Sequence, residues 1–120
     1  MDNLPLVNIL VTNFKQSKYA QECFSGIASQ TYPKDKLNVI IVDDGSNDNS
    51  CEEIKVAADN AGISYNLFTK ENGGTASARN FGLSKCSNDF VQFNDIDDVL
   101  LPSGIEDRIK VFLCKENIGL

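Results

Sequence analysis

Two short apolar runs rich in β-branched residues constrain the fold of this 120-residue chain more than any other feature. Residues 7–12 (VNILVT) and 37–42 (LNVIIV) have the composition of buried strands. Between them, residues 17–30 place apolar side chains at helical spacing, and Tyr32-Pro33 closes the segment. A strand, a helix and a strand in this order predict one parallel crossover unit.

The second half of the chain continues this alternation. Ser50, with Glu53 three residues later, predicts a capping box at the start of a helix, and Gly62 is placed to end that helix. Strand candidates and helical segments then follow one another: a helix at 50–59, a strand at 63–69, a helix at 75–85, a strand at 90–94 and a helix beginning near 103.

Alternating strands and helices predict an α/β fold, with a mostly parallel sheet and helices on both faces. A length of 120 residues with 42% hydrophobic content fits one compact domain. In such sheets, ligands bind beyond the carboxyl ends of the strands. The segments that follow the four strand candidates therefore matter most for function: residues 12–15, 43–46, 70–74 and 95–98.

Composition excludes several function classes. A net charge of −6 argues against nucleic-acid binding, because phosphate backbones are bound by clusters of Lys and Arg. Four cysteines without a C-x-x-C pair, and the absence of histidine, argue against structural zinc and Cys-His catalysis. Cys23 and Cys86 are expected to be core residues in a reducing compartment. With no signal-peptide pattern and no apolar run of about 20 residues, we expect a soluble cytoplasmic domain.

Three carboxylates lie within four residues at the end of the fourth strand candidate: Asp95, Asp97 and Asp98. Like charges that close a buried strand repel one another, so they need a cation or ample water. All-oxygen ligands without a nearby His or Cys favour Mg²⁺ or Mn²⁺. A solvated acidic turn is the alternative interpretation. An EF-hand loop is set aside because Val99 and Leu100 occupy positions that need an oxygen ligand and a Gly.

Polar and aromatic residues follow the first two strand candidates as well. Asp43 and Asp44 end the second run, and Gly45 permits a tight turn. A carboxylate there can accept a hydrogen bond from a nucleobase N–H or a ribose hydroxyl, although an ordinary turn with helix-capping residues is the alternative. Phe14 could lie against a base, a contact worth about 1 to 3 kcal/mol at other base-stacking sites, or belong to the core.

Gly73 and Gly74 precede the third helix candidate. Free backbone N–H groups at such a helix start suit a phosphate, and Arg79 could add positive charge about one turn later. An ordinary loop with a surface arginine is the alternative. Neither G-x-G-x-x-G nor the P-loop motif occurs. Because all these loops share one sheet edge, a divalent cation between carboxylates and phosphates would let an acidic pocket bind a nucleoside diphosphate.

Taken together, these segments resemble the N-terminal, donor-binding half of a family 2 glycosyltransferase with the Rossmann-like GT-A fold. The resemblance implies that residues 1–120 form the nucleotide-sugar-binding part of such a domain, truncated at its C-terminus. The matching stretches run in family order over nearly the whole chain: residues 7–14, 29–32, 39–48, 71–80 and 93–102.

The resemblance implies roles for the nucleoside-binding residues. Asp44 would contact the base, and Asp43 would support the nucleoside pocket. Phe14 would stack on the base where the family usually has Tyr. Thr12 belongs to the same nucleotide-binding stretch, at a position where Pro is common.

The resemblance also implies a metal and diphosphate site. Asp95 and Asp97 match the family's D-x-D motif, with Asp97 as the direct ligand of Mn²⁺ or Mg²⁺ and Asp95 nearer the ribose or a metal-bound water. Arg79 would help to hold the nucleotide or its diphosphate. The catalytic base, an Asp or Glu in the acceptor-binding half, would come beyond Leu120.

Members of this family commonly use UDP-sugars and invert the anomeric centre by direct displacement. The resemblance therefore implies metal-dependent transfer of a sugar to a glycan, lipid-linked or other hydroxyl acceptor, as in polysaccharide biosynthesis. It places the protein in the cytoplasm or, at full length, at the inner face of a membrane. A non-catalytic nucleotide-sugar-binding module and a nucleotidyltransferase are the alternatives. An exposed sheet edge would favour a homo-oligomer.

Overall fold

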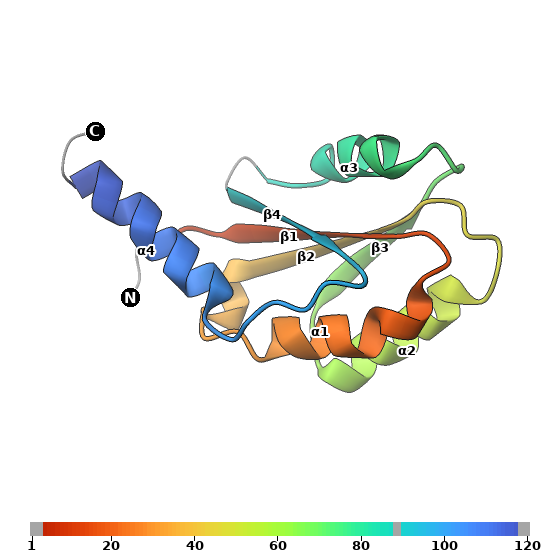
Figure 1. The fold of residues 1–120 in the computed structure, drawn as a ribbon, viewed down its shortest axis with the longest axis horizontal. Coiled ribbons are helices and arrows are strands. Elements are labelled where there is room, and N and C mark those ends of the chain that lie inside the picture. Colours follow the sequence, from red (N-terminus) through yellow and green to blue (C-terminus); the bar gives the residue numbers. More distant parts are fainter. Residues whose placement is uncertain (1–3, 88–89, 118–120) are drawn as a thin grey trace.

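The structure, a computed structural model, describes residues 4–87 and 90–117, with side chains as far as Cys114. It contains four parallel strands and four α-helices, with two short 3₁₀ turns between them (Figure 1). The strands are β1 Val7–Asn13, β2 Leu37–Asp43, β3 Tyr65–Thr69 and β4 Phe90–Asp95. The helices are α1 Ala20–Ala28, α2 Ser50–Ala61, α3 Thr75–Leu83 and α4 Gly104–Asn117, and the 3₁₀ turns are η1 Ser17–Tyr19 and η2 Lys34–Lys36.

The predicted α/β fold is confirmed. The sheet has the order β3-β2-β1-β4, and all its pairings are parallel. Helices α1 and α2 lie against one face and α3 against the other (Figure 1). Every residue of β1 is buried, because this central strand is covered on both faces. That double coverage explains why β1 and β2 are continuous apolar runs rather than alternating ones.

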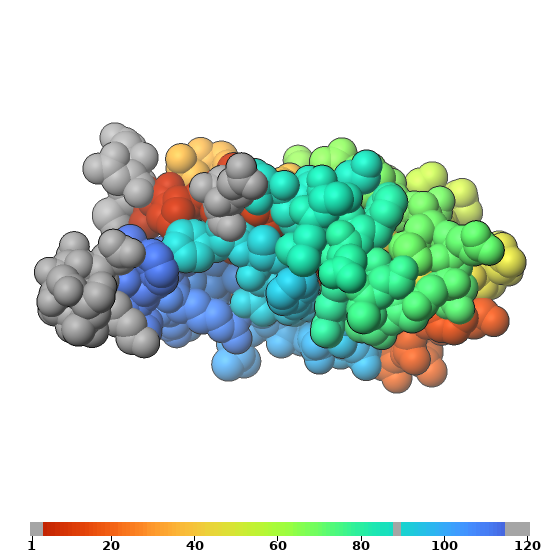
Figure 2. Space-filling view, turned by 90° about the horizontal axis from the view of Figure 1, so that it is seen from above, coloured from red at the N-terminus to blue at the C-terminus, as the bar shows by residue number. Residues whose placement is uncertain are grey.

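Two apolar clusters fill the space on either side of the sheet. The larger one joins the sheet to α1, α2 and α4, and Phe24 on α1 and Ile54 on α2 are fully buried within it. The smaller one joins Leu10 on β1 and Ile40 on β2 to Ala78 on α3. Seen from above in Figure 2, α3 and the neighbouring β4 form the middle of the visible face.

The predicted capping box at the start of α2 is wrong. The N-cap residue is Asn49, which makes no side-chain capping bond, and Ser50 lies inside the first turn with its hydroxyl unpaired. Asp48 accepts the Ser50 backbone N–H at 2.8 Å instead. The Glu53 carboxylate accepts the Ser17 hydroxyl at 2.7 Å rather than returning to its own helix.

The other helix boundaries differ from the predicted ones by one turn or less. The helix expected at 17–30 begins as the 3₁₀ turn η1 and becomes α-helical only at Ala20. Gly62 ends α2 in the left-handed conformation, as predicted.

Cys23 is buried in the core as expected, whereas Cys86 is only half-buried beside the smaller cluster. None of the described helices is both long and apolar enough to cross a membrane.

The strand order defines where a ligand site should form. From β1 the chain moves outward through β2 to β3, then returns past β1 to add β4 on its other side. The carboxyl ends of β1 and β4 therefore flank the point where the winding reverses, which is the usual ligand position in open α/β sheets. Thr12 and Asp95 are register partners at this point.

Candidate functional site

A cavity of about 250 Å³ opens at the carboxyl edge of the sheet, beside the ends of β1 and β4. Five of the residues predicted from the sequence line it: Thr12, Phe14, Asp44, Asp95 and Asp97. The loops after three different strands thus meet around one space. The remaining lining residues, which sequence reasoning did not single out, are Asn13, Gln16, Thr75, Ala78 and Ile96.

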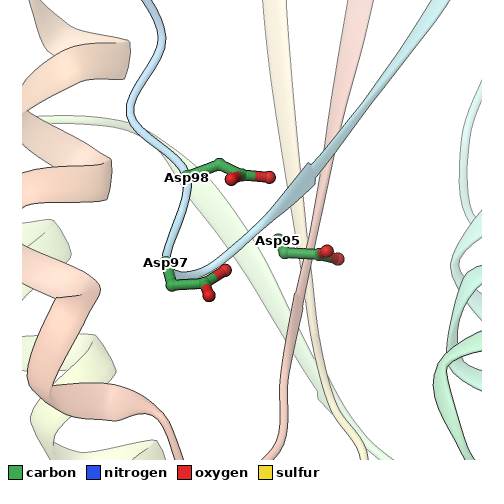
Figure 3. A group of neighbouring side chains, drawn as sticks. All are labelled: Asp95, Asp97 and Asp98. Atoms are coloured by element: carbon green, nitrogen blue, oxygen red, sulfur yellow. The ribbon is translucent and has the colours of Figure 1, made fainter.

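The acidic segment forms a tight turn beyond β4. The backbone N–H of Asp98 donates to the carbonyl of Asp95 at 2.9 Å, and the N–H of Ile96 donates to the carbonyl of Thr12 at 3.0 Å. Figure 3 shows the carboxylates of Asp95, Asp97 and Asp98 extending toward the same side of this turn, with one oxygen of each within 4.8 Å of the others. Asp97 and Asp98 are exposed, and Asp95 is half-buried.

This carboxylate group fits a divalent cation. Two oxygens bound to one Mg²⁺ at about 2.1 Å are at most about 4.2 Å apart, so small side-chain rotations would bring these oxygens within range. The ligand atoms are all oxygen, which Mg²⁺ and Mn²⁺ prefer. Within the described part of the chain, the carboxylate of Asp97 has no hydrogen-bond or ion-pair partner, so it is free to coordinate a metal.

Asp95 already has two partners. The hydroxyl of Thr12 donates to its Oδ1 at 2.8 Å, and the guanidinium of Arg79 lies 3.5 Å from the same oxygen. Arg79 also lies over the ring of Phe93, 5.5 Å from the centroid. Arg79 does not line the cavity itself, and its contact with the site is the ion pair with Asp95.

Asp44 is the most heavily hydrogen-bonded carboxylate of the site. Lys70 Nζ and the N–H of Gly73 each lie 3.1 Å from Oδ1. The N–H of Gly74 and the side-chain amide of Asn72 donate to Oδ2 at 2.8 and 3.2 Å. A carboxylate offers about four lone-pair positions, so all are used by this loop. The N–H groups of Gly73 and Gly74 are therefore bound to Asp44 and are not free for a phosphate in this structure.

A close backbone contact holds that loop against the end of β2. Gly45 has a φ of +72°, and a Cβ atom there would lie 2.5 Å from the backbone nitrogen of Asn72. Only glycine allows the two loops to approach this closely without strain. The contact keeps the donors of the loop within reach of Asp44.

The environment of Asp44 predicts a pH dependence of stability. Burial by itself raises the pKa of Asp44, but the hydrogen bonds from Lys70 and the two glycine N–H groups outweigh it and hold the pKa below its ordinary value of 3.8. The stabilisation is therefore complete above the unfolded-state pKa and is lost as the pH falls through the folded-state value. We expect urea unfolding between pH 6 and pH 3 to show that Asp44→Asn loses less stability on acidification than the unsubstituted chain. If the two proteins lose the same amount of stability, the lowered pKa of Asp44 is not the cause.

Asp43 supports the site from below rather than lining it. Its Oδ1 accepts the side-chain amide of Asn13 at 2.8 Å and the hydroxyl of Ser46 at 2.6 Å, and its Oδ2 accepts the Ser46 N–H at 3.1 Å. The Ser46 hydroxyl oxygen in turn accepts the N–H of Lys15 at 2.9 Å. Asp43 is only 3% exposed, so this buried network joins the loops after β1 and β2.

Phe14 lies at the rim of the cavity and is 42% exposed, which excludes the alternative that it is a core aromatic. The ammonium of Lys15 lies 5.2 Å from the centroid of its ring. Lys15 adopts a positive φ of 56°, which turns the chain away after β1. Phe14 thus presents an aromatic surface beside the polar end of the cavity.

The chain matches the Glycosyl transferase family 2 model over residues 8–117. It is similar to an uncharacterized glycosyltransferase from Haemophilus influenzae, with 32% identity over 111 residues. That match covers 92% of this chain but only 44% of the relative, so the chain spans less than half of that protein's length.

Solved structures with a similar fold include TarS and PcManGT. S. aureus TarS 1-349 in complex with UDP-GlcNAc has a TM-score of 0.79 and 26% identity, covering 92% of this chain and 31% of that one. The mannosyltransferase PcManGT from Pyrobaculum calidifontis, in complex with GDP-Man and Mn²⁺, has a TM-score of 0.73 and 28% identity. The match covers 79% of this chain and 28% of the PcManGT chain.

Proposed function

The chain belongs to glycosyl transferase family 2, and from this membership we propose that it carries the donor site of an enzyme that transfers a sugar from a UDP-sugar to a hydroxyl acceptor. Residues 1–120 would form the nucleotide-sugar-binding part of the domain. The observation that carries this proposal is the cavity at the β1–β4 edge, where an aromatic ring, a buried carboxylate and an acidic turn converge.

The nucleoside would occupy the end of the cavity formed by β1 and β2. Phe14 offers a ring face for base stacking, and Asp44 lies deeper as the acceptor for a base N–H. Because the loop around Lys70 already fills the acceptor positions of Asp44, base binding would replace one of those donors. Asp43 keeps the two loops in place.

The diphosphate and the metal would occupy the end formed by β4. Asp97 would coordinate Mn²⁺ or Mg²⁺ directly, and Asp95, oriented by Thr12 and Arg79, would lie toward the ribose or a metal-bound water. When bound, the cation would neutralise the charge of the leaving diphosphate. Arg79 would add positive charge to the same region.

Similar proteins support the ligand class. TarS has been solved with UDP-GlcNAc and PcManGT with GDP-Man and Mn²⁺, which supports a nucleotide sugar and a divalent cation as the ligands of this site. We further propose inversion by direct displacement, with a catalytic Asp or Glu supplied by the acceptor-binding part of the whole protein. The free thiols of the chain agree with a reducing compartment, and we propose that the site works in the cytoplasm.

Isothermal titration with UDP tests the donor site directly. We expect UDP to bind at least about tenfold more tightly with Mn²⁺ than with EDTA, because a cation removes the repulsion between the acidic turn and the diphosphate. Titration with GDP under the same conditions shows whether the site binds uracil or guanine nucleotides more tightly. If a folded sample binds neither nucleotide in the presence of Mn²⁺, the donor-site assignment is wrong.

A further inference from the structure

Asn94 is a buried polar residue directly beneath the acidic turn. It lies in the edge strand β4, and only 4% of its surface is exposed, whereas Phe93 before it is 44% exposed. A buried amide needs partners, since an unsatisfied one destabilises the fold. Its partners therefore indicate what the residue does.

The side-chain amide of Asn94 binds the backbone of the turn itself. Its Nδ2 lies 3.2 Å from the carbonyl oxygen of Asp95 and 3.3 Å from that of Asp98. It also lies 3.4 Å from Sγ of Cys23 on α1. One amide group thus joins the first and last residues of the turn to the helix beneath it.

We propose that Asn94 is a positioning residue for the metal site, whose amide holds the turn closed so that the carboxylates of Asp95, Asp97 and Asp98 stay converged before a cation binds. The inference rests on the proposed function. It adds a residue that would touch neither nucleotide nor metal but would set the geometry of the groups that do.

Electrostatics explain why a neutral donor is needed at this place. Three carboxylates within 4.8 Å repel one another, and this repulsion tends to open the turn. The only cation within ion-pair distance among the described residues, Arg79, contacts Asp95 alone. In Figure 3 the carboxylates extend away from α1, which carries Cys23. The fixation by Asn94 therefore acts on the backbone and leaves the carboxylate oxygens available.

The base of the turn is uncharged. The pKa of the Cys23 thiol is raised to about 12, mainly by burial; the hydrogen bond from Asn94 lowers it, and the nearby charges of Asp98 and Asp97 raise it. The thiol is therefore neutral at physiological pH and adds no fourth negative charge. A neutral thiol and a neutral amide give the turn a base that does not compete for the cation.

Substitution of Asn94 by Leu tests the proposal, because Leu fills a similar volume and has no donor. Substitutions of residues that orient metal ligands commonly weaken metal binding 10- to 100-fold, and we expect a loss of about that size in Mn²⁺ affinity, measured by electron paramagnetic resonance of free Mn²⁺. Hydrogen exchange of the Asp98 amide should be faster even without metal. UDP affinity in EDTA should change by less than about twofold.

Two controls separate positioning from general destabilisation. Asn8→Leu removes the side-chain amide of another buried asparagine, which lies near the amino end of β1, away from the cavity. The amide of Asn8 donates to the carbonyl of Phe90. Ile54→Val trims a fully buried core side chain on α2 and leaves Asn94 and its partners in place. Both variants should lose thermal stability and retain Mn²⁺ affinity within about threefold. If Asn94→Leu does not fold, Asn94→Ala, in which water can reach the turn, is measured by the same criteria.

The outcomes distinguish this inference from the proposed function. Unchanged Mn²⁺ affinity and unchanged Asp98 exchange in the Asn94 variant would overturn the positioning role while the donor site stands. An equal loss of Mn²⁺ affinity in Asn8→Leu would also overturn it, because stability alone would then account for the effect. If the unsubstituted chain shows no Mn²⁺-dependent UDP binding, the proposed function fails and this inference fails with it.

Discussion

Replacing Asp97 with Asn should weaken Mn²⁺ binding by at least about 100-fold and remove the metal-dependent gain in UDP affinity. Substitution of residues behind a metal ligand already costs about 10- to 100-fold, so loss of a direct ligand should reach or exceed the upper end of that range. Asp97 is exposed, lines the cavity and has no protein partner for its carboxylate among the described residues. Electron paramagnetic resonance of free Mn²⁺ and calorimetry with UDP would measure the two effects.

A control with the same change in charge is Asp35→Asn. Asp35 is exposed in η2, which precedes β2 at the amino edge of the sheet, away from the cavity. We expect it to bind Mn²⁺ and UDP as the unsubstituted chain does. Asp95→Asn should have a smaller effect on the metal than Asp97→Asn, because Oδ1 of Asp95 is already engaged by Thr12 and Arg79. The reverse order would assign the direct ligand to Asp95.

The fold was largely predictable because its strongest sequence signals are local. Continuous β-branched runs mark β1 and β2, since parallel strands covered on both faces have no solvent side. The start of α2 was not predictable in the same way. Asp48 and Ser50 both offer oxygen acceptors near the first turn, and spacing alone does not decide which of them binds a free N–H.

The residues that line the site were largely predictable from the sequence, but the hydrogen bonds between them were not. Parallel strands place their carboxyl ends at one edge, so the meeting of Phe14, Asp44 and Asp97 follows from the order of elements. The saturation of Asp44 depends on contacts 26 to 30 residues away, which form only when β3 pairs with β2. The role proposed for Asn94 involves a contact with Cys23 across 71 residues. Periodicity contains no signal for such pairs.

Replacing Asp43 with Ala should lower the free energy of unfolding by about 3 to 5 kcal/mol. Hydrogen bonds to a charged acceptor contribute about 1.5 to 3 kcal/mol each, and Asp43 accepts three that share one carboxylate, so their effects do not add fully. The hydroxyl and the N–H of Ser46 would then be buried donors without their acceptor, and the Asn13 amide would keep its 3.3 Å bond to the Ser46 hydroxyl. Urea denaturation at pH 7 would measure the loss.

Two further variants show whether this effect comes from the network. Asp35→Ala removes an exposed carboxylate and should change stability by less than about 0.5 kcal/mol. Asp43→Asn keeps the size of the side chain but replaces one acceptor with a donor, so it should fall between Asp43→Ala and the unsubstituted chain. If Asp43→Ala unfolds at the same urea concentration as Asp35→Ala, the loops after β1 and β2 do not depend on Asp43. The rigidity of the cavity end proposed for the nucleoside would then need another source, such as the Gly45 contact with Asn72.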